Sequence, residues 1–443
     1  MPAYKGKFQY TPADGSKPQD GACSVQFDEQ QFSLSPDQGP ATAFDLGDLN
    51  AVAAADYQIA LPLYNGSRIQ LQQFGKSYDD LARELLDAYR TRVLQCLLLE
   101  DLQEIALYNA SFTLNVPGEP QRSGAAEIRL FKSNLAVLPN LSQAFQWRLA
   151  DINSVRFDPG AYEVVLESDV GELKLCKLAR RTEDFTSHLR DAMDALAQES
   201  AQALHALFPF LDADQVRSAN GLLREGRSVS LARLNSVHPR IANAITENAV
   251  DAGMKPYFDD LAARAGKGEI YAGFKLIRNE EKPATAPLEN GGAEDADDEP
   301  AGAPDADTDA PQALYWFFFP IHDASPSGKT SQLVAWEASS ASGRATYFFR
   351  LTSGSGAVPG ESTSLLDSGI ARLSRVLGML NFRRRPIYLS DEQLESNPTF
   401  HRYAIAARRL PEVREVRAEF VGRALHSSLD AWKTQVENII AKP

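Results

Sequence analysis

The sequence predicts a mixed α+β protein in which two antiparallel sheet units follow one another and are succeeded by helices and a third sheet region. Three observations support this prediction: a motif that recurs after 103 residues, short segments in which apolar residues alternate, and an amphipathic helix at the end of each copy. The length of 443 residues is that of about three domains.

The repeated motif is L-x-D-(L/I)-N-x-V. Residues 46–52 read LGDLNAV and residues 149–155 read LADINSV. The flanking segments also correspond, and each alternates as a half-buried strand does. The corresponding pairs are Tyr57–Leu61 with Tyr162–Leu166, Arg68–Leu71 with Glu172–Leu175, and the proline-ended hairpins 25–36 and 128–139.

An amphipathic helix is expected to end each copy. The first begins at Ser77, with Asp80 completing a capping box, and the second begins at Thr182, where Glu183 and Asp184 favour the positive helix end. Apolar residues follow at spacings of three or four. They are Tyr78, Leu81, Leu85, Tyr89, Val93 and Leu97 in the first helix, and Phe185, Leu189, Met193 and Leu196 in the second.

Several short antiparallel strands closed by one helix resemble the pleckstrin-homology (PH-like) superfold, over residues 4–100 and 120–205. The resemblance implies PH-like domains at 1–110 and 118–205, with the repeated motif at the turn from the third to the fourth strand. Many lipid-binding members carry a basic K-x(n)-(K/R)-x-R motif across their first two strands. Here Lys5 and Lys7 have no basic counterpart in residues 23–27, and the second copy offers only Arg129 and Lys132.

Residues 206–266 lack strand alternation, so we expect a helical module there. Asp212 can cap a helix through Leu223, and Pro239 can open another that ends at Val250. Pro256 can open a third, with Phe258 and Leu261 facing inward.

Residues 267–385 repeat the order of strands followed by a helix and are expected to form a third, divergent PH-like unit without the motif. Its helix is expected to open at Ser364 with Asp367, and to bury Leu366, Ile370, Leu373, Leu377 and Leu380. The predicted strands are Glu269–Ile277, Ala313–Ile321, Gln332–Ala338 and Ala345–Thr352.

An acidic insertion, residues 280–311, is expected within that unit. It holds eleven acidic residues against Lys282 alone, which accounts for most of the chain's net charge of −14. With one large aliphatic residue and no aromatics, it cannot bury enough apolar surface to fold, and we expect it to be disordered. It is either a solubilising loop between two strands or a segment that attracts a basic partner.

Residues 386–443 are expected to be a helical C-terminal segment. Its apolar stripe either packs on the third unit or forms a seam between copies of the chain, which would make a homo-oligomer. The stripe consists of Val413, Val416, Phe420, Leu425, Leu429, Trp432, Val436 and Ile439.

The sequence offers no catalytic, metal or cofactor motif. No two histidines stand at i, i+4, and Ser325–Thr330 lacks the first glycine of a phosphate-binding loop because Asp323 occupies its place. Cys96 beside three leucines is interpreted as a core thiol. Asp48 and Asp151 are expected to cap their turns together with the neighbouring asparagines.

The binding residues that we predict are arginines of a basic C-terminal stretch, which carries a net +5 over residues 372–423. They are Arg383, Arg384, Arg385, Arg408 and Arg409. Three adjacent arginines after a helix can complement the helix dipole, or they can dock phosphate, acidic lipid or an acidic protein segment.

We therefore expect a non-enzymatic, cytoplasmic protein-interaction or scaffold protein, since PH-like sheets bind peptides along a strand or groove. The alternative is a peripheral membrane module that binds anionic lipid through the arginines. The acidic pI of about 5.0 disfavours nucleic acid as a partner. Three scattered cysteines and an N-terminus without an apolar leader favour a reducing compartment.

Overall fold

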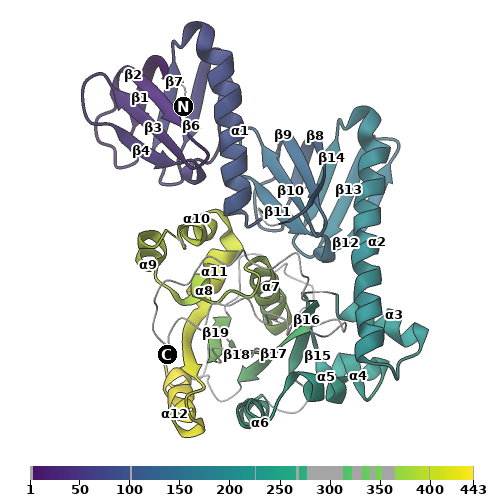
Figure 1. Cartoon of the computed structure of the whole chain (residues 1–443). Helices are drawn as coiled ribbons and strands as arrows, with labels where there is room; N and C mark the ends of the chain where they lie inside the picture. Colours follow the sequence, from purple (N-terminus) through teal and green to yellow (C-terminus); the bar gives the residue numbers. More distant parts are fainter. Residues whose placement is uncertain are drawn as a thin grey trace, which may run out of the picture. The chain divides into compact units, whose positions relative to one another are not determined.

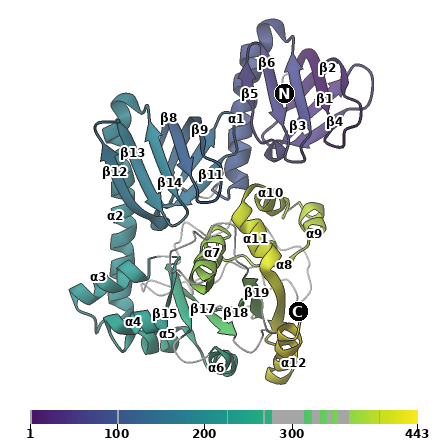
Figure 2. The same cartoon turned by 180° about the vertical axis from the view of Figure 1, so that it is seen from behind.

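The computed structural model describes residues 3–99, 102–224, 226–265, 269–276, 313–321, 332–339, 345–351, 365–398 and 400–442 (Figures 1 and 2). These residues divide into two compact bodies. The N-terminal body comprises Met1–Ala192 and Leu394–Leu410, and the C-terminal body comprises Met193–Gln393 and Pro411–Pro443. Among the described helices none is both long and apolar enough to cross a membrane.

Two seven-stranded antiparallel sheets form most of the N-terminal body. The first has the order β4-β3-β2-β1-β7-β6-β5 and the second has the order β11-β10-β9-β8-β14-β13-β12, so strand for strand they are the same. The first sheet consists of β1 (Tyr4–Thr11), β2 (Gln19–Phe27), β3 (Gln31–Pro36), β4 (Thr42–Asp45), β5 (Ala53–Ala55), β6 (Gln58–Pro62) and β7 (Arg68–Gln72). The second consists of β8 (Glu104–Asn115), β9 (Arg122–Phe131), β10 (Asn134–Pro139), β11 (Phe145–Arg148), β12 (Ile152–Asp158), β13 (Glu163–Ser168) and β14 (Glu172–Cys176).

Each sheet is followed by its helix, α1 (Tyr78–Cys96) or α2 (Thr182–Leu207), as the repeat predicts. Leu81 and Leu85 of α1 and Phe185 and Leu189 of α2 are fully buried, which confirms the predicted stripes at these positions. The mixed α+β class and the hairpin β2–β3 are likewise confirmed.

The predicted capping box of α1 is wrong. The chain enters α1 through a short 3-10 helix, Gly75–Ser77, so Ser77 already has helical backbone angles and its side chain caps nothing. Asp80 instead forms an ion pair with Arg83 at 2.7 Å. A second 3-10 helix, Ala179–Arg181, precedes α2 in the same way.

The two copies share even their unusual backbone angles. Positive φ occurs at Tyr57 (58°) and Tyr162 (56°), and again at Gln73 (63°) and Lys177 (61°). Non-glycine residues seldom adopt this region, so its recurrence at matching positions is strong evidence that the copies have one architecture.

The repeated motif lies after the fourth strand of each sheet, and not between the third and fourth as expected. It begins as a 3-10 turn, Leu46–Asp48 in the first copy and Leu149–Asp151 in the second. The leucine that opens each turn is buried, and so is the Leu49 or Ile152 that follows, which explains why these positions are alike.

The helices expected in residues 206–266 are present in the C-terminal body. Asp212 forms a complete capping box on α3 (Ala213–Leu222), and Phe258 and Leu261 of α6 (Lys255–Arg264) are buried. Between them lie α5 (Ile241–Ala249) and two unpredicted elements, β15 (Ser228–Ser230) and α4 (Leu231–Val237).

The third sheet is a six-stranded antiparallel meander in the order β15-β16-β17-β18-β19-β20, an order unlike that of the first two. Its central strand β17 is buried on both faces, because Phe317 and Phe319 pack on Phe258 of α6 while Trp316 packs on Phe382. The strands after β15 are β16 (Tyr271–Leu276), β17 (Ala313–Ile321), β18 (Gln332–Ala338), β19 (Ala345–Leu351) and β20 (Phe420–Leu425). The acidic segment 280–311 lies outside the described residues, as do Ser364 and the residues 325–330.

Helices α7 (Leu365–Met379), α8 (Arg385–Tyr388), α9 (Asp391–Ser396), α10 (His401–Arg409), α11 (Pro411–Glu419) and α12 (Leu429–Ile440) complete the chain. The expectation of helix at Phe420–Leu425 is wrong, because these residues pair with β19 as strand β20. The stripe on α12 packs into the core around the third sheet, where Trp432 and Val436 are fully buried.

Leu189→Ala should lower the free energy of unfolding of the N-terminal body by about 2–5 kcal/mol, since it opens a cavity at a fully buried site. Leu141→Ala is the matched control: this leucine is 76% exposed, and its loss should change stability by less than about 0.5 kcal/mol. Hydrogen exchange of the β13 and β14 amides under increasing urea measures both variants. An equal loss of stability in the two variants would contradict the assignment of Leu189 to the buried core.

Candidate recognition site

A segment from late in the sequence belongs to the N-terminal body. Residues 394–410, which include helix α10, pack with the first sheet and with α1, although more than 300 residues separate them in the chain. Figures 1 and 2 both place α10 beside the C-terminal end of α1. The contact is made to the turn that the repeated motif forms in the first copy.

Arg409 is the centre of this contact and is only 1% exposed. Its Nε donates to the carbonyl of Gly47 at 2.8 Å, and its Nη2 donates to the carbonyl of Leu49. Its guanidinium carbon also lies over the rings of Tyr64 and Tyr89, 5.2 and 5.6 Å from their centroids. Carbonyl acceptors and aromatic faces therefore replace the water that the cation loses on burial.

Gly47 is required for this close approach. A Cβ atom there would lie 2.8 Å from the Cys96 Sγ and 2.9 Å from Cγ2 of Ile405 on α10. The corresponding residue of the second copy is Ala150. The first turn is thus shaped to admit a helix where the second carries a methyl group.

Arg408 and His401 surround Arg409 with pairs to carboxylates. Arg408 forms ion pairs with Asp48 at 2.8 Å and with Glu395 at 2.6 Å. His401 lies 3.4 Å from Asp45, which also accepts two hydrogen bonds from Arg92 at 2.9 and 2.7 Å. Asp45 and Asp48, the two acidic residues at the turn of the first copy, therefore both pair with basic side chains.

The turn of the second copy is stabilised by a different ion pair. Arg148 occupies the position that Asp45 has in the first copy, and it pairs with Asp151 at 3.1 Å. The expectation that Asp48 caps its turn is wrong: Asp45 accepts from the Gly47 amide instead, and Asp48 is directed to Arg408.

The five predicted arginines fall in different parts of the chain. Arg408 and Arg409 belong to the N-terminal body, while Arg383, Arg384 and Arg385 belong to the C-terminal body. Arg384 is 4% exposed and lies 5.9 Å from the centroid of the Trp336 ring, so it and Arg409 do not present their charge to solvent. Binding by these five arginines stays a prediction.

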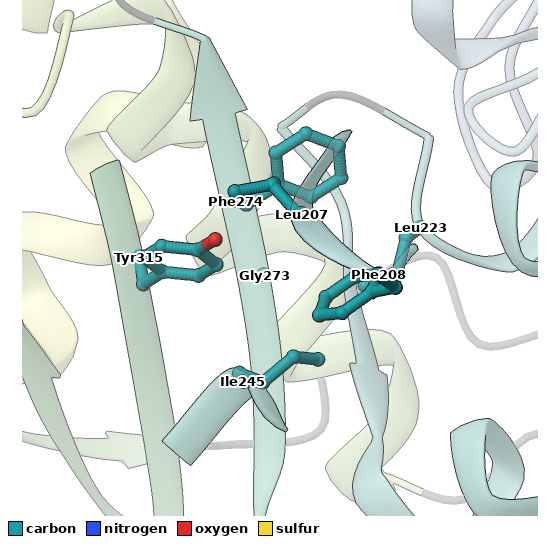
Figure 3. Close-up of a pocket in the computed structure, with 7 residues that line it drawn as sticks. All are labelled: Leu207, Phe208, Leu223, Ile245, Gly273, Phe274 and Tyr315. Atoms are coloured by element: carbon teal, nitrogen blue, oxygen red, sulfur yellow. The ribbon is translucent and has the colours of Figure 1, made fainter. Parts of the chain in front are cut away.

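A pocket in the C-terminal body is apolar and too narrow for a water molecule (Figure 3). Tyr315 supplies the one polar side chain among its lining residues, and burial raises the pKa of this hydroxyl to about 12. The lining consists of Leu207, Phe208, Leu223, Ile245, Gly273, Phe274 and Tyr315. We interpret the pocket as a packing gap.

A buried polar cluster in the same body joins β18, β19 and α12. Thr346 donates to Glu337 at 2.7 Å and accepts from the Trp432 indole at 2.9 Å, and His426 lies 3.3 Å from Glu337. All four side chains are almost fully buried, so the cluster fastens these elements together. Within the described part of the chain, no group of three potential ligands is placed to hold a metal ion.

Fold and site together define a chain of repeated antiparallel sheets, the first of which holds an arginine-bearing helix. Comparison with known proteins finds no matching family model and no similar curated protein. The sequence analysis missed the role of Arg409 because it interpreted the arginines as surface groups. The one sequence signal for it is the glycine at position 47 of the repeated motif.

Arg409→Ala should loosen the docked helix, because the carbonyls of Gly47 and Leu49 would lose their donor. We expect a cost of about 1–3 kcal/mol and faster hydrogen exchange in α10 and in residues 46–50. Arg83→Ala, at an exposed ion pair of α1, is the control and should leave this exchange unchanged. Identical exchange in the two variants would refute the assigned role.

The thiol of Cys96 should make the stability fall at high pH. Burial raises its pKa to about 12. An unfolded thiol ionises near its ordinary pKa of 9.0, so between these values the unfolded state binds fewer protons than the folded state. Over this range the thiol lowers the free energy of unfolding by up to about 1.4 kcal/mol per pH unit as the pH rises. Urea unfolding from pH 8 to 10.5 should show a shallower loss in Cys96→Ala, and an unchanged slope would contradict this.

Proposed function

We propose that the chain is a non-enzymatic protein-interaction or scaffold protein of the cytoplasm, built on tandem PH-like units. Support comes from two sheets of identical strand order, each followed by a helix, as the resemblance implies. The third sheet has a different order, so the proposal rests on the first two units.

One observation carries the proposal: the first unit already binds a helix from a distant part of the chain. It does so with hydrogen bonds from Arg409 to backbone carbonyls and with ion pairs from Arg408. These are the interactions by which protein surfaces recognise peptides, and they need no cofactor.

The edge strand β12 is the element we propose for an external partner. It spans seven residues and pairs only with β13 in its sheet, whereas its counterpart β5 has three residues. Arg156 of this strand is exposed, and both it and the half-buried Ser154 contact Glu167 of β13. An extended peptide can add to such an edge through main-chain hydrogen bonds.

A photo-crosslinking residue at Arg156 in the full chain tests the proposal. We expect it to capture a protein of the host, and excess unlabelled chain should compete for that capture. The same group at Lys255, an exposed residue of α6, is the matched control and should capture nothing competable. Equal capture at both positions, or none at Arg156, would count against the proposed edge.

The alternative of anionic-lipid binding retains one supporting observation. Arg383 is half-buried, and its guanidinium has no hydrogen bond or ion pair to any residue that the structure describes. Sedimentation with phosphatidylserine-containing vesicles, compared with neutral vesicles and with Arg383→Ala, distinguishes this alternative from the scaffold. The scaffold proposal expects no more sedimentation with the anionic vesicles than with the neutral ones.

A further inference from the structure

The hairpin between β6 and β7 has an exposed Asn-Gly dipeptide at its tip. Leu63 and Ser67 close the loop, because the Leu63 amide donates to the Ser67 carbonyl at 2.9 Å. Asn65 and Gly66 lie between them and are exposed. Gly66 has a φ of 87°, in the left-handed region that hairpin loops of this length commonly give to glycine. The turn therefore presents this dipeptide to water.

The Asn65 side chain is folded over the peptide bond that follows it. Its Oδ1 accepts a hydrogen bond from the Ser67 amide at 2.9 Å. The ring of atoms that this bond closes contains both the Asn65 Cγ and the Gly66 nitrogen, so the bond keeps the side chain close to that nitrogen and polarises its carbonyl. Gly66 has no side chain that would obstruct an approach between the two atoms.

We propose that Asn65 is a site of spontaneous deamidation, in which the chain reacts with water. The Gly66 nitrogen gives up its proton and attacks Cγ of Asn65. A C–N bond forms, the Cγ–Nδ2 bond breaks, and the amide leaves as ammonia after it takes up a proton. Water then opens the cyclic imide at Cγ, which gives aspartate, or at the backbone carbonyl carbon, which gives isoaspartate. One water molecule is consumed and one ammonia is released, with no oxidation or reduction.

A second Asn-Gly dipeptide, Asn220 and Gly221, shows what the fold adds to the sequence. It lies within α3, where the Asn220 Nδ2 donates to the Ala197 carbonyl at 3.0 Å. Side chains of a helix tilt toward its N-terminus, away from the nitrogen of the next residue. The helix must therefore open before Asn220 can react, whereas Asn65 needs only a local opening of an exposed loop. A third such dipeptide, residues 290–291, lies outside the described residues.

The reaction at Asn65 alters the hairpin on which the docked helix rests. The amide of the neighbouring Tyr64 donates to the Asp48 carbonyl of the repeated motif at 2.9 Å, and the Tyr64 ring lies under the guanidinium of Arg409. Isoaspartate adds a methylene group to the backbone of this short loop, and both products add a negative charge to it. The modification therefore weakens the docking of α10, an effect that goes beyond the proposed function.

The test incubates the full chain at mildly alkaline pH and physiological temperature. Peptide mapping by mass spectrometry follows each asparagine, and methylation by a protein isoaspartyl methyltransferase detects isoaspartate. We expect the loss of Asn65 to be at least about tenfold faster than that of Asn220, since an exposed loop opens more readily than a helix. Hydrogen exchange of α10 should become faster as Asn65 is lost.

Asn65→Gln is the matched control variant. A glutamine must close a larger ring, so it should yield no methylated product at this position, and its α10 exchange should stay constant during incubation. Two results would overturn the proposal. Loss of Asn65 no faster than that of Asn220 would mean that the turn protects its amide. Unchanged α10 exchange in chains that have lost Asn65 would mean that the hairpin tip does not support the docked helix.

Discussion

The N-terminal body depends on one buried cation. Arg409 is held by two backbone carbonyls and two tyrosine rings, and not by a carboxylate. The Gly47 carbonyl can approach because position 47 has no side chain, and Tyr89 is oriented by its own hydrogen bond to the Asn50 carbonyl at 2.8 Å. The repeated motif, the end of α1 and α10 are therefore three parts of one contact, which meet at the guanidinium group.

The two copies show how one substitution changes what a shared turn does. Asp45 of the first copy accepts from Arg92 and lies near His401, so Asp48 is left to receive Arg408. Arg148 at the same position of the second copy neutralises Asp151 within its own sheet. The backbone is alike, down to the positive φ angles at Tyr57 and Tyr162. The change of charge at this position and the replacement of Gly47 by Ala150 therefore restrict the docking of α10 to the first copy, while the strand order stays the same.

Local patterns predicted local structure well and long-range structure poorly. The bounds of β17 and β18 match the apolar runs Ala313–Ile321 and Gln332–Ala338, because each strand is buried by its own composition. Strands β15 and β20 could not be found in this way, since short segments become strands only by pairing with β16 and β19. The candidate site was hidden for a related reason. Arginine is almost always exposed, and only the fold shows that Arg409 is enclosed by residues that lie more than 300 positions earlier.

The C-terminal body uses its buried arginines differently from the N-terminal body. There, α7 is held to α11 by arginines that have their own carboxylates: Arg372 pairs with Glu419, and Arg375 pairs with Glu412 at 2.7 Å. Each of those arginines has a carboxylate as its partner. Arg409 is held instead by the carbonyls of Gly47 and Leu49 and by the rings of Tyr64 and Tyr89. The docking of α10 therefore depends on the backbone geometry of the repeated motif, whereas the contact between α7 and α11 depends on pairs of side chains.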